Sequence, residues 1–352
     1  MTNNLQSIKQ FGQKIWIDNI SRDLINSGSL ARLIEEDGIA GVTSNPTIFY
    51  KAISNDKYYQ EDLIKVKKSN LSPEARYENL VIPDIQAACD IMLPLYTKSK
   101  FEDGYVSFEV SPHLCHDKHG TIENARRLWQ DINRPNLMIK IPATPSGIEA
   151  LTQLTFDGIN VNITLLFSLK QVIHTWKAYI TGLQKRYNRN LPVDTIKAVA
   201  SFFLSRIDQA IDDKLPEDLQ GTAAINLSKM AFLAYSELFN SETFNTLKRY
   251  GAKEQYLLWA STGTKNPKYS DVLYIEELIG NPTINTVPDA TLTAFRDHGV
   301  ARNSLTEKID QAPVILEKVQ EYVNMDELGE QLQKEGLKLF EDSFNQLMEL
   351  VK

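Results

Sequence analysis

Residues 137–142 read Leu-Met-Ile-Lys-Ile-Pro, a short apolar strand with one charged side chain, Lys140, in its middle. Side chains alternate between the two faces of a strand, so Lys140 shares a face with Met138, while Ile139 and Ile141 occupy the other. A buried, unpaired ammonium is costly, and such a lysine must either find a partner or lose its proton. The stretch therefore predicts a strand that places one polar, reactive group in an otherwise apolar layer.

Seven other segments are similarly short, apolar and closed by polar or turn-forming residues. The eight strands that we expect, in chain order, are Ile15–Ile20, Gly41–Asn45, Tyr105–Val110, Leu137–Pro142, Val161–Phe167, Ala198–Leu204, Tyr256–Ser261 and Thr283–Val287. Longer helical stretches separate them, a pattern typical of parallel strands with right-handed crossovers. Eight such units predict an α/β fold, a closed (β/α)8 TIM barrel, with an open doubly wound sheet as the alternative.

Helix signals support this order of elements. Ser168 with Gln171, and Ser146 with Glu149, fit capping boxes just after two of the strands. Residues 46–100 contain more helix than one crossover needs, and residues 300–352 form a C-terminal helical tail with a broad apolar face. We expect a single domain over residues 1–352, with barrel strands at about 15–287 and extra N-terminal, inserted and C-terminal helices.

Polar residues recur on one face of the expected strands, toward their C-terminal ends. If the apolar faces meet the helices, one barrel lumen receives Asp18, Asn45, Glu109, Lys140, Asn162, Thr164 and Ser201. Barrel active sites lie at the C-terminal ends of the strands. The alternation of side chains along the strands therefore predicts a polar cluster around Lys140 at the C-terminal mouth of the barrel, provided that no bulge shifts a strand.

Two readings of Lys140 remain open on the residues alone. It can be a structural lysine paired with Glu109 or Asp18. It can also be a nucleophile, because a buried amine loses its proton more easily and the neutral amine attacks a carbonyl. Schiff-base chemistry needs proton transfers, which two neighbouring carboxylates can provide.

Motifs along nearly the whole chain, in the same order, carry a family resemblance. They are Trp16-Ile17-Asp18-Asn19-Ile20, Thr43-Ser44-Asn45-Pro46-Thr47, Val106-Ser107-Phe108-Glu109-Val110, Ile139-Lys140-Ile141-Pro142-Ala143-Thr144, the run from Asn160 to Ser168, the run from Ala200 to Arg206, and the run from Trp259 to Pro267. With these motifs the chain resembles the transaldolases. The resemblance implies transfer of a dihydroxyacetone unit from sedoheptulose 7-phosphate or fructose 6-phosphate to glyceraldehyde 3-phosphate or erythrose 4-phosphate, in the non-oxidative pentose phosphate pathway.

The resemblance also implies residue roles and the absence of any metal or organic cofactor. Lys140 matches the Schiff-base lysine, and Asp18 matches the acid/base that acts on the donor hydroxyl. Glu109 and Thr164 match the pair that orders the catalytic water. The substrate-binding set that it implies is Asn45, Asn162 and Ser201 for the dihydroxyacetone hydroxyls, Phe203 beside the carbanion, and Arg206, Ser261 and Lys265 toward the phosphate.

The chain departs from the family pattern near the phosphate. Many relatives have an arginine two residues after the serine that matches Ser261, whereas this chain has Gly263 and then Lys265. Lysine provides a point charge but not the two-pronged fit of arginine. The segment Tyr179–Asp194 also looks long for its connection, which suggests the bacterial subgroup with larger insertions.

Composition limits the other possibilities. The net charge of −7 argues against a long nucleic-acid track. The N-terminus lacks the features of a signal peptide, no apolar run is long enough for a bilayer, and two cysteines fit a reducing compartment. We therefore expect a cytoplasmic monomer or homodimer that binds sugar phosphates, with no nucleic-acid or membrane partner. The triplet His113, His116 and His119 lies in a loop, and we expect no metal site there.

Two other functions remain as alternatives. A class I fructose-6-phosphate aldolase-like lyase would cleave the same donor and release dihydroxyacetone. Such enzymes tend to have Gln and Tyr at the places of Glu109 and Phe203, and Phe203 has no hydroxyl to protonate the carbanion. A non-catalytic sugar-phosphate-binding barrel would keep Arg206 and Ser261 but would have no use for a reactive lysine.

Overall fold

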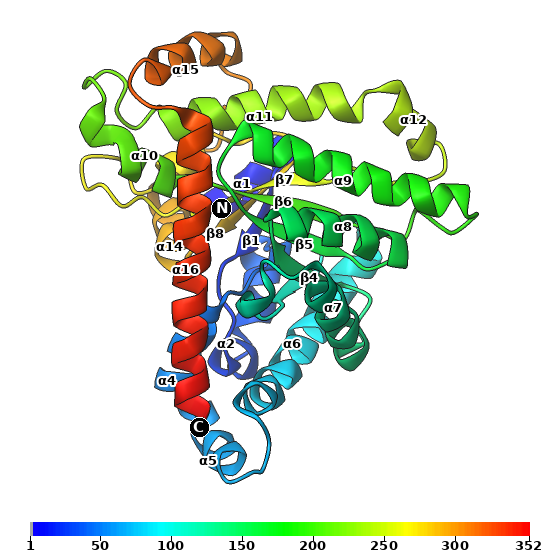
Figure 1. Cartoon of the computed structure of the whole chain (residues 1–352). Coiled ribbons are helices and arrows are strands. Elements are labelled where there is room, and N and C mark those ends of the chain that lie inside the picture. The colour runs from blue at the N-terminus through cyan, green and yellow to red at the C-terminus, as the bar shows by residue number, and fades with distance from the viewer. Residues whose placement is uncertain (1–2) are drawn as a thin grey trace.

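A computed structural model describes residues 3–352 and contains a closed barrel of eight parallel strands in sequential order, β1 to β8 (Figure 1). Their bounds are β1 Lys14–Ile17, β2 Gly41–Val42, β3 Tyr105–Glu109, β4 Leu137–Pro142, β5 Val161–Leu166, β6 Ala198–Phe203, β7 Tyr256–Ala260 and β8 Thr283–Val287. The (β/α)8 prediction is confirmed, and the open-sheet alternative is wrong because β1 pairs with β8 as well as with β2. Several strands end earlier than expected. The largest differences are in β1 and β2, where Asp18 and the stretch Thr43–Asn45 lie outside the strands.

Helices surround the barrel and join its strands. They are α1 Asn4–Ile8, α2 Arg22–Asn26, α3 Ser29–Arg32, α4 Pro46–Asn55, α5 Gln60–Lys67, α6 Pro73–Lys98, α7 Lys118–Ile132, α8 Pro145–Asp157, α9 Leu169–Asn188, α10 Ser205–Ile211, α11 Ala223–Phe239, α12 Glu242–Lys248, α13 Leu273–Glu276, α14 Asp289–His298, α15 Ala312–Gln320 and α16 Met325–Val351. The extra N-terminal helix is α1, the 46–100 insertion is α4 to α6, and the C-terminal tail is α15 and α16.

Of the two capping boxes predicted from the sequence, the structure contains one. The capping box at Ser168 is present, since Ser168 accepts from the backbone of Gln171 and the Gln171 side chain accepts in return. The expected box at Ser146 is wrong: Thr144 caps α8 by accepting from Gly147 N, and Ser146 donates to the His116 carbonyl. The long segment from Tyr179 is mostly the second half of α9, so this expected insertion is an extension of a regular helix.

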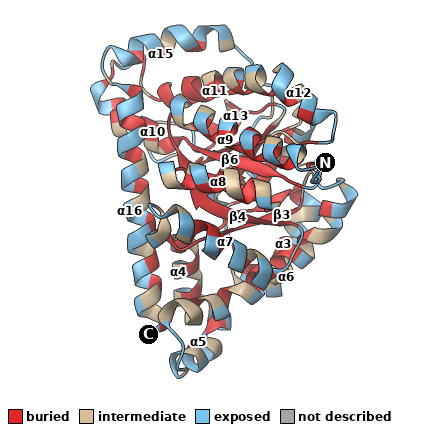
Figure 2. Ribbon diagram, turned by 45° about the vertical axis from the view of Figure 1, so that its right-hand side comes forward, coloured by how far each residue is buried: buried red, intermediate tan, exposed pale blue. Residues whose placement is uncertain are grey.

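The long helix α16 runs down one side of the molecule from α15 to α5 and packs on α4, α6 and the end of β5 (Figure 1). Its apolar side is buried and the opposite side is exposed (Figure 2). Ser343 bonds to Thr47 of α4 at 2.8 Å, and Arg76 of α6 donates to the carbonyl oxygens of Val351 and Lys352. These contacts attach the C-terminal tail to the early part of the chain.

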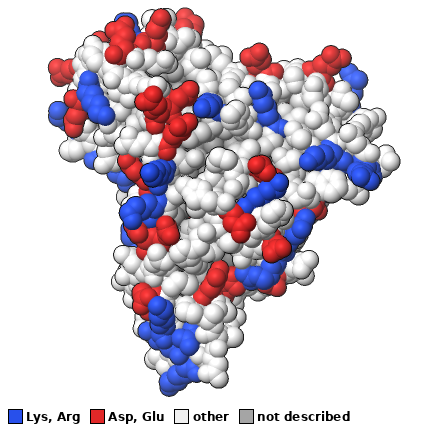
Figure 3. All heavy atoms as spheres, viewed as in Figure 1, with Lys and Arg blue, Asp and Glu red and all other residues white. Residues whose placement is uncertain are grey.

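Basic and acidic side chains are interspersed over the face shown in Figure 3. The run Lys65-Val66-Lys67-Lys68 lies at the end of α5, where its three lysines are exposed on the helix surface. Within residues 3–352, no helix is both long and apolar enough to cross a membrane.

Candidate active site

Lys140 lies in the middle of a polar layer that three neighbouring strands build. In the register of the barrel, Glu109 of β3 is opposite Lys140 of β4, and Lys140 is opposite Asn162 of β5. Lys140 Nζ lies 2.7 Å from Glu109 Oε1 and donates to the Ser44 carbonyl oxygen at 2.8 Å. The Lys140 side chain is only 5% exposed, so both contacts compensate for the loss of water around its charge.

Asp18 follows β1 and approaches the same mouth from another side of the barrel. Its backbone N–H donates to the Val287 carbonyl, and its Oδ1 accepts from Thr43 Oγ1 at 2.8 Å. Thr43 also bonds to Thr286 Oγ1 at 2.6 Å. This pair of threonines fixes the Asp18 carboxyl at the surface of the cavity, where a substrate hydroxyl can reach it.

Both carboxyl groups hold their protons more strongly than free carboxyls. Burial raises the pKa of Asp18, and the charge of Lys140 and the bond from Thr43 only partly offset it. Burial likewise raises the pKa of Glu109, against the opposing effect of Lys140 and with a small addition from Asp18. Raised pKa values bring carboxyl groups closer to the range in which they exchange protons at neutral pH.

A chain of polar side chains lies beneath the cavity. Ser201 Oγ donates to Asn162 Oδ1 at 2.7 Å, and Asn162 Nδ2 donates to Ser107 Oγ at 3.0 Å. Asn162 and Ser107 are fully buried, and Ser201 is nearly so. These hydrogen bonds orient the Asn162 amide and leave Ser201 at the cavity surface.

Thr164 lies two residues beyond Asn162, toward the C-terminal end of β5. Its Oγ1 is buried and has no hydrogen-bond partner among the described residues. A buried hydroxyl without a partner is uncommon, and it marks a place where a ligand or an ordered water can bind. Leu165 follows with a φ of +63°, and the pairing of β5 with β6 shifts here, between Ile163 and Leu166. On its other side Thr164 keeps the regular register with Pro142 of β4, so the alternation of side chains holds up to this residue.

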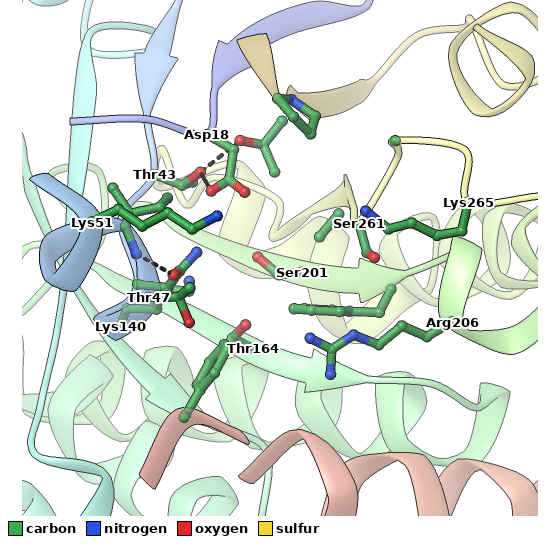
Figure 4. Close-up of a pocket in the computed structure, with 18 residues that line it drawn as sticks. Asp18, Thr43, Thr47, Lys51, Lys140, Thr164, Ser201, Arg206, Ser261 and Lys265 are labelled. Carbon is green, nitrogen blue, oxygen red and sulfur yellow. Dashed lines mark hydrogen bonds between the residues drawn. The ribbon is translucent and has the colours of Figure 1, made fainter. Parts of the chain in front are cut away.

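These groups open into a cavity of about 310 Å³ at the C-terminal end of the barrel (Figure 4). Asn45 lines its wall while its side-chain oxygen caps α4 by accepting from Ile48 N at 3.0 Å. The cap uses the amide oxygen, so the amide nitrogen is left for a ligand. The volume suits a small polar molecule such as a sugar phosphate.

The far side of the cavity is cationic. Figure 4 shows Arg206 and Lys265 across from Lys140 and Asp18, with Ser201 between the two groups. Burial lowers the pKa of the Arg206 guanidinium, which nevertheless stays charged, and this guanidinium lies 5.6 Å from the ring centre of Phe203. Ser261, with a φ of +55°, bonds to Ser205 Oγ at 2.9 Å.

All of the site residues predicted from the sequence lie at this mouth. Glu109 and Asn162 lie just beneath the cavity and contact Lys140 and Ser201; the others line it, namely Asp18, Asn45, Lys140, Thr164, Ser201, Phe203, Arg206, Ser261 and Lys265. The structure thus brings the predicted set together, while the role of each residue remains a prediction.

Phe340, Thr47 and Lys51 are among the cavity residues that the sequence did not identify. Phe340 of α16 lines the wall, and its ring centre is 5.7 Å from Lys140 Nζ. Because Phe340 lies on the apolar face of the C-terminal tail, the sequence predicted only that it packs against the barrel. Thr47 and Lys51 lie on α4, close after Asn45 in the sequence, and their position in the first turns of a helix that starts at the mouth could have identified them.

Within residues 3–352, no group of three His, Cys, Asp or Glu side chains could hold a metal ion. His113 instead faces α16, where it lies 3.4 Å from Glu341 and against the edge of Phe344. The expected loop contains a 3₁₀ turn, Pro112–Leu114, and His119 belongs to α7. The 3₁₀ turn therefore serves as a docking point for α16.

The profile of the transaldolase/fructose-6-phosphate aldolase family matches residues 15–351. The chain is 47% identical, over 354 residues, to a transaldolase of Thiobacillus denitrificans, and the alignment covers 98% of this chain and 99% of that protein. It is 47% identical to a transaldolase of Neisseria gonorrhoeae, with 98% of both chains covered. It is 44% identical to transaldolase 2 of a Nostoc species, covering 98% of this chain and 96% of that one.

Proposed function

The chain belongs to the transaldolase/fructose-6-phosphate aldolase family, and we propose that it works as a transaldolase through a Schiff base on Lys140. It is an enzyme that transfers a ketone-bearing unit, here dihydroxyacetone, between sugar phosphates in the pentose phosphate pathway. The observation that carries the proposed mechanism is the Lys140 amine, buried in the barrel mouth and 2.7 Å from Glu109.

The first step forms the covalent intermediate. Lys140 passes a proton to Glu109, and the neutral Nζ attacks C2 of the ketose phosphate. A proton moves from the nitrogen to the former carbonyl oxygen, and loss of water from this carbinolamine leaves an iminium ion. Glu109 is the nearest acid to the nitrogen, and Thr164 Oγ1 has no partner among the described residues. The two can hold the departing water between them and pass it the proton that it needs.

The second step breaks a carbon–carbon bond. The Asp18 carboxylate takes the proton of the C4 hydroxyl, the C3–C4 bond cleaves, and the aldose phosphate leaves with an aldehyde group. The bonding electrons move to the iminium and give a neutral enamine on Lys140. An acceptor aldose phosphate then undergoes the reverse sequence, in which the enamine carbon attacks its aldehyde and Asp18 returns the proton to the new hydroxyl.

The polar layer suits recognition of the transferred unit. The Asn45 amide nitrogen, the Asn162 amide and the Ser201 hydroxyl lie around Lys140 at the cavity surface or just below it. Hydrogen bonds to two hydroxyls can discriminate strongly against a donor that lacks them, because buried polar groups would be left unpaired.

The cationic side suits the phosphate. Arg206, Ser261 and Lys265 offer a guanidinium, a hydroxyl and an ammonium on one wall. A β-carbon at position 263 would lie 4.0 Å from Lys265 Nζ, so the lysine reaches the space that Gly263 leaves open. We infer that Lys265 supplies the second positive charge to the phosphate, as a point charge beside the forked Arg206.

Release of free dihydroxyacetone separates transfer from the aldolase alternative. Phe203 lines the cavity and carries no hydroxyl that could protonate the enamine. We therefore expect fructose 6-phosphate alone to give little free dihydroxyacetone, and erythrose 4-phosphate to restore rapid turnover with sedoheptulose 7-phosphate as product. Efficient release of dihydroxyacetone without an acceptor would reject the transferase mechanism in favour of the lyase.

The reaction proceeds by proton transfers and needs no metal or organic cofactor. We propose that the enzyme acts on sugar phosphates in the cytoplasm, as a monomer or a homodimer.

A further inference from the structure

One side chain of α16 bonds to the ends of the two strands that carry Lys140 and Thr164. Gln333 Nε2 donates to the carbonyl oxygen of Ala143, just after β4, and to that of Leu165 in β5, each at 3.0 Å. Both partners are acceptors, so only the nitrogen of the amide can serve them. The C-terminal helix is thereby tied to the barrel beside the proposed catalytic groups.

Leu165 is a residue whose conformation needs support. Its φ of +63° is a left-handed value, which costs a non-glycine residue about 1 kcal/mol or more. Such strain persists only where surrounding structure enforces it. Leu165 directly follows Thr164, which lines the cavity, so a change in the conformation of Leu165 would be transmitted to the backbone of Thr164 through the peptide bond that they share.

Two glycines let α16 come close enough for these bonds. A β-carbon at Gly336 would lie 2.9 Å from Leu165 Cδ2, and one at Gly329 would lie 2.7 Å from Ser168 Cβ. They flank Gln333 on one face of the helix. A second glutamine, Gln171, holds the same turn by accepting from Phe167 N at 2.7 Å and donating to the Gly329 carbonyl at 3.1 Å.

We propose that Gln333 is a positioning residue for the reaction. By holding the Leu165 turn, it keeps Thr164 Oγ1 directed at the water that is released and consumed on the Schiff base. Gln333 does not line the catalytic cavity and acts only through the β5 turn. This inference rests on the proposed function, in which Thr164 takes part in catalysis.

The test uses two glutamines of the same helix. Gln333→Ala removes the bonds, and Gln333→Glu keeps the shape but presents a carboxylate to two carbonyl oxygens. Loss of the support should lower kcat about five- to thirtyfold, with the KM for fructose 6-phosphate within about twofold of the wild type. Gln331→Ala and Gln331→Glu are the matched controls, because Gln331 is exposed and bonds only to Glu335; they should leave both constants unchanged.

A double-mutant cycle with Thr164→Ala identifies the route. If Gln333 acts through Thr164, Gln333→Ala should have almost no further effect on kcat in the Thr164→Ala enzyme. Additive losses, or a Gln333→Ala enzyme with wild-type kcat, would overturn the inference and leave the proposed function intact. A Thr164→Ala enzyme with wild-type kcat would instead refute the catalytic role of Thr164 itself, on which the inference depends.

Discussion

At the scale of single residues, burial of the Asp18 carboxylate lowers the stability of the folded protein while it places the group where catalysis needs it. Asp18 is needed as a carboxylate, yet burial raises its pKa above the ordinary value of 3.8. The folded protein therefore binds this proton more tightly than the unfolded chain. The stability that this group contributes is fully present below about pH 4 and is lost as the pH rises through the raised pKa of the folded state.

Asp18→Asn should accordingly stabilise the protein while it inactivates the enzyme. At pH 7 the amide removes the cost of a buried charge, and we expect Tm to rise by roughly 1–3 °C. The difference should shrink toward pH 4, because Asp18 then takes up its proton in the wild type. Activity should fall about a hundredfold or more. Thermal melts of both proteins from pH 4 to pH 8 check this, and a lower Tm for the variant at pH 7 would contradict it.

The alternation of side chains along a strand identifies the site residues that lie on the strands. Strand alternation is a property of the backbone, so the order of residues alone assigns Lys140, Glu109 and Asn162 to one face, and the barrel register agrees. Phe340 and Gln333 could not be found in this way, because a residue of a C-terminal helix reaches the site only through tertiary packing. The departure at Leu165 was equally hidden, since leucine rarely adopts a positive φ.

At the scale of elements, α4 links the architecture of the site to its binding of the substrate. Asn45 caps this helix with its oxygen and presents its nitrogen toward the cavity. The sequence predicted a helix N-cap correctly where only one polar residue was a candidate, as at Ser168 for α9. At α8 there were two candidates, and the N-cap is Thr144, which lies nearer to the end of β4 than Ser146. Local pattern alone cannot rank two competing caps.

Asn45 should have separable effects on stability and binding. Asn45→Asp keeps the capping oxygen, so we expect Tm to stay within about 1 °C of the wild type. It loses the amide donor, so the KM for the ketose donor should rise about tenfold. Asn45→Ala should show the same kinetic defect and also lose about 1 kcal/mol of stability. Equal destabilisation by both substitutions, or a fully active Asn45→Asp, would refute this division of roles.

At the scale of the whole molecule, α16 connects the end of the chain to its beginning. Arg76, Thr47 and His113 contact it from α6, α4 and the loop before α7. We propose that residues 1–352 form one domain, so calorimetry should give a single transition whose calorimetric and van't Hoff enthalpies agree, with activity lost over the same range. A separate early transition that abolishes activity would indicate that the tail unfolds independently.

The covalent intermediate on Lys140 can be trapped by reduction. The enzyme is treated with fructose 6-phosphate and sodium borohydride, then digested and mapped by mass spectrometry. We expect a reduced iminium adduct on the peptide that contains Lys140, either of the whole ketose phosphate or, after protonation of the enamine carbon, of the three-carbon unit. The Lys140→Met variant should show neither adduct. Lys51 of the same cavity and Lys197, which is buried just before β6, serve as internal controls. An adduct on either of them, or no adduct on Lys140 in an active preparation, would refute the Schiff-base mechanism on Lys140.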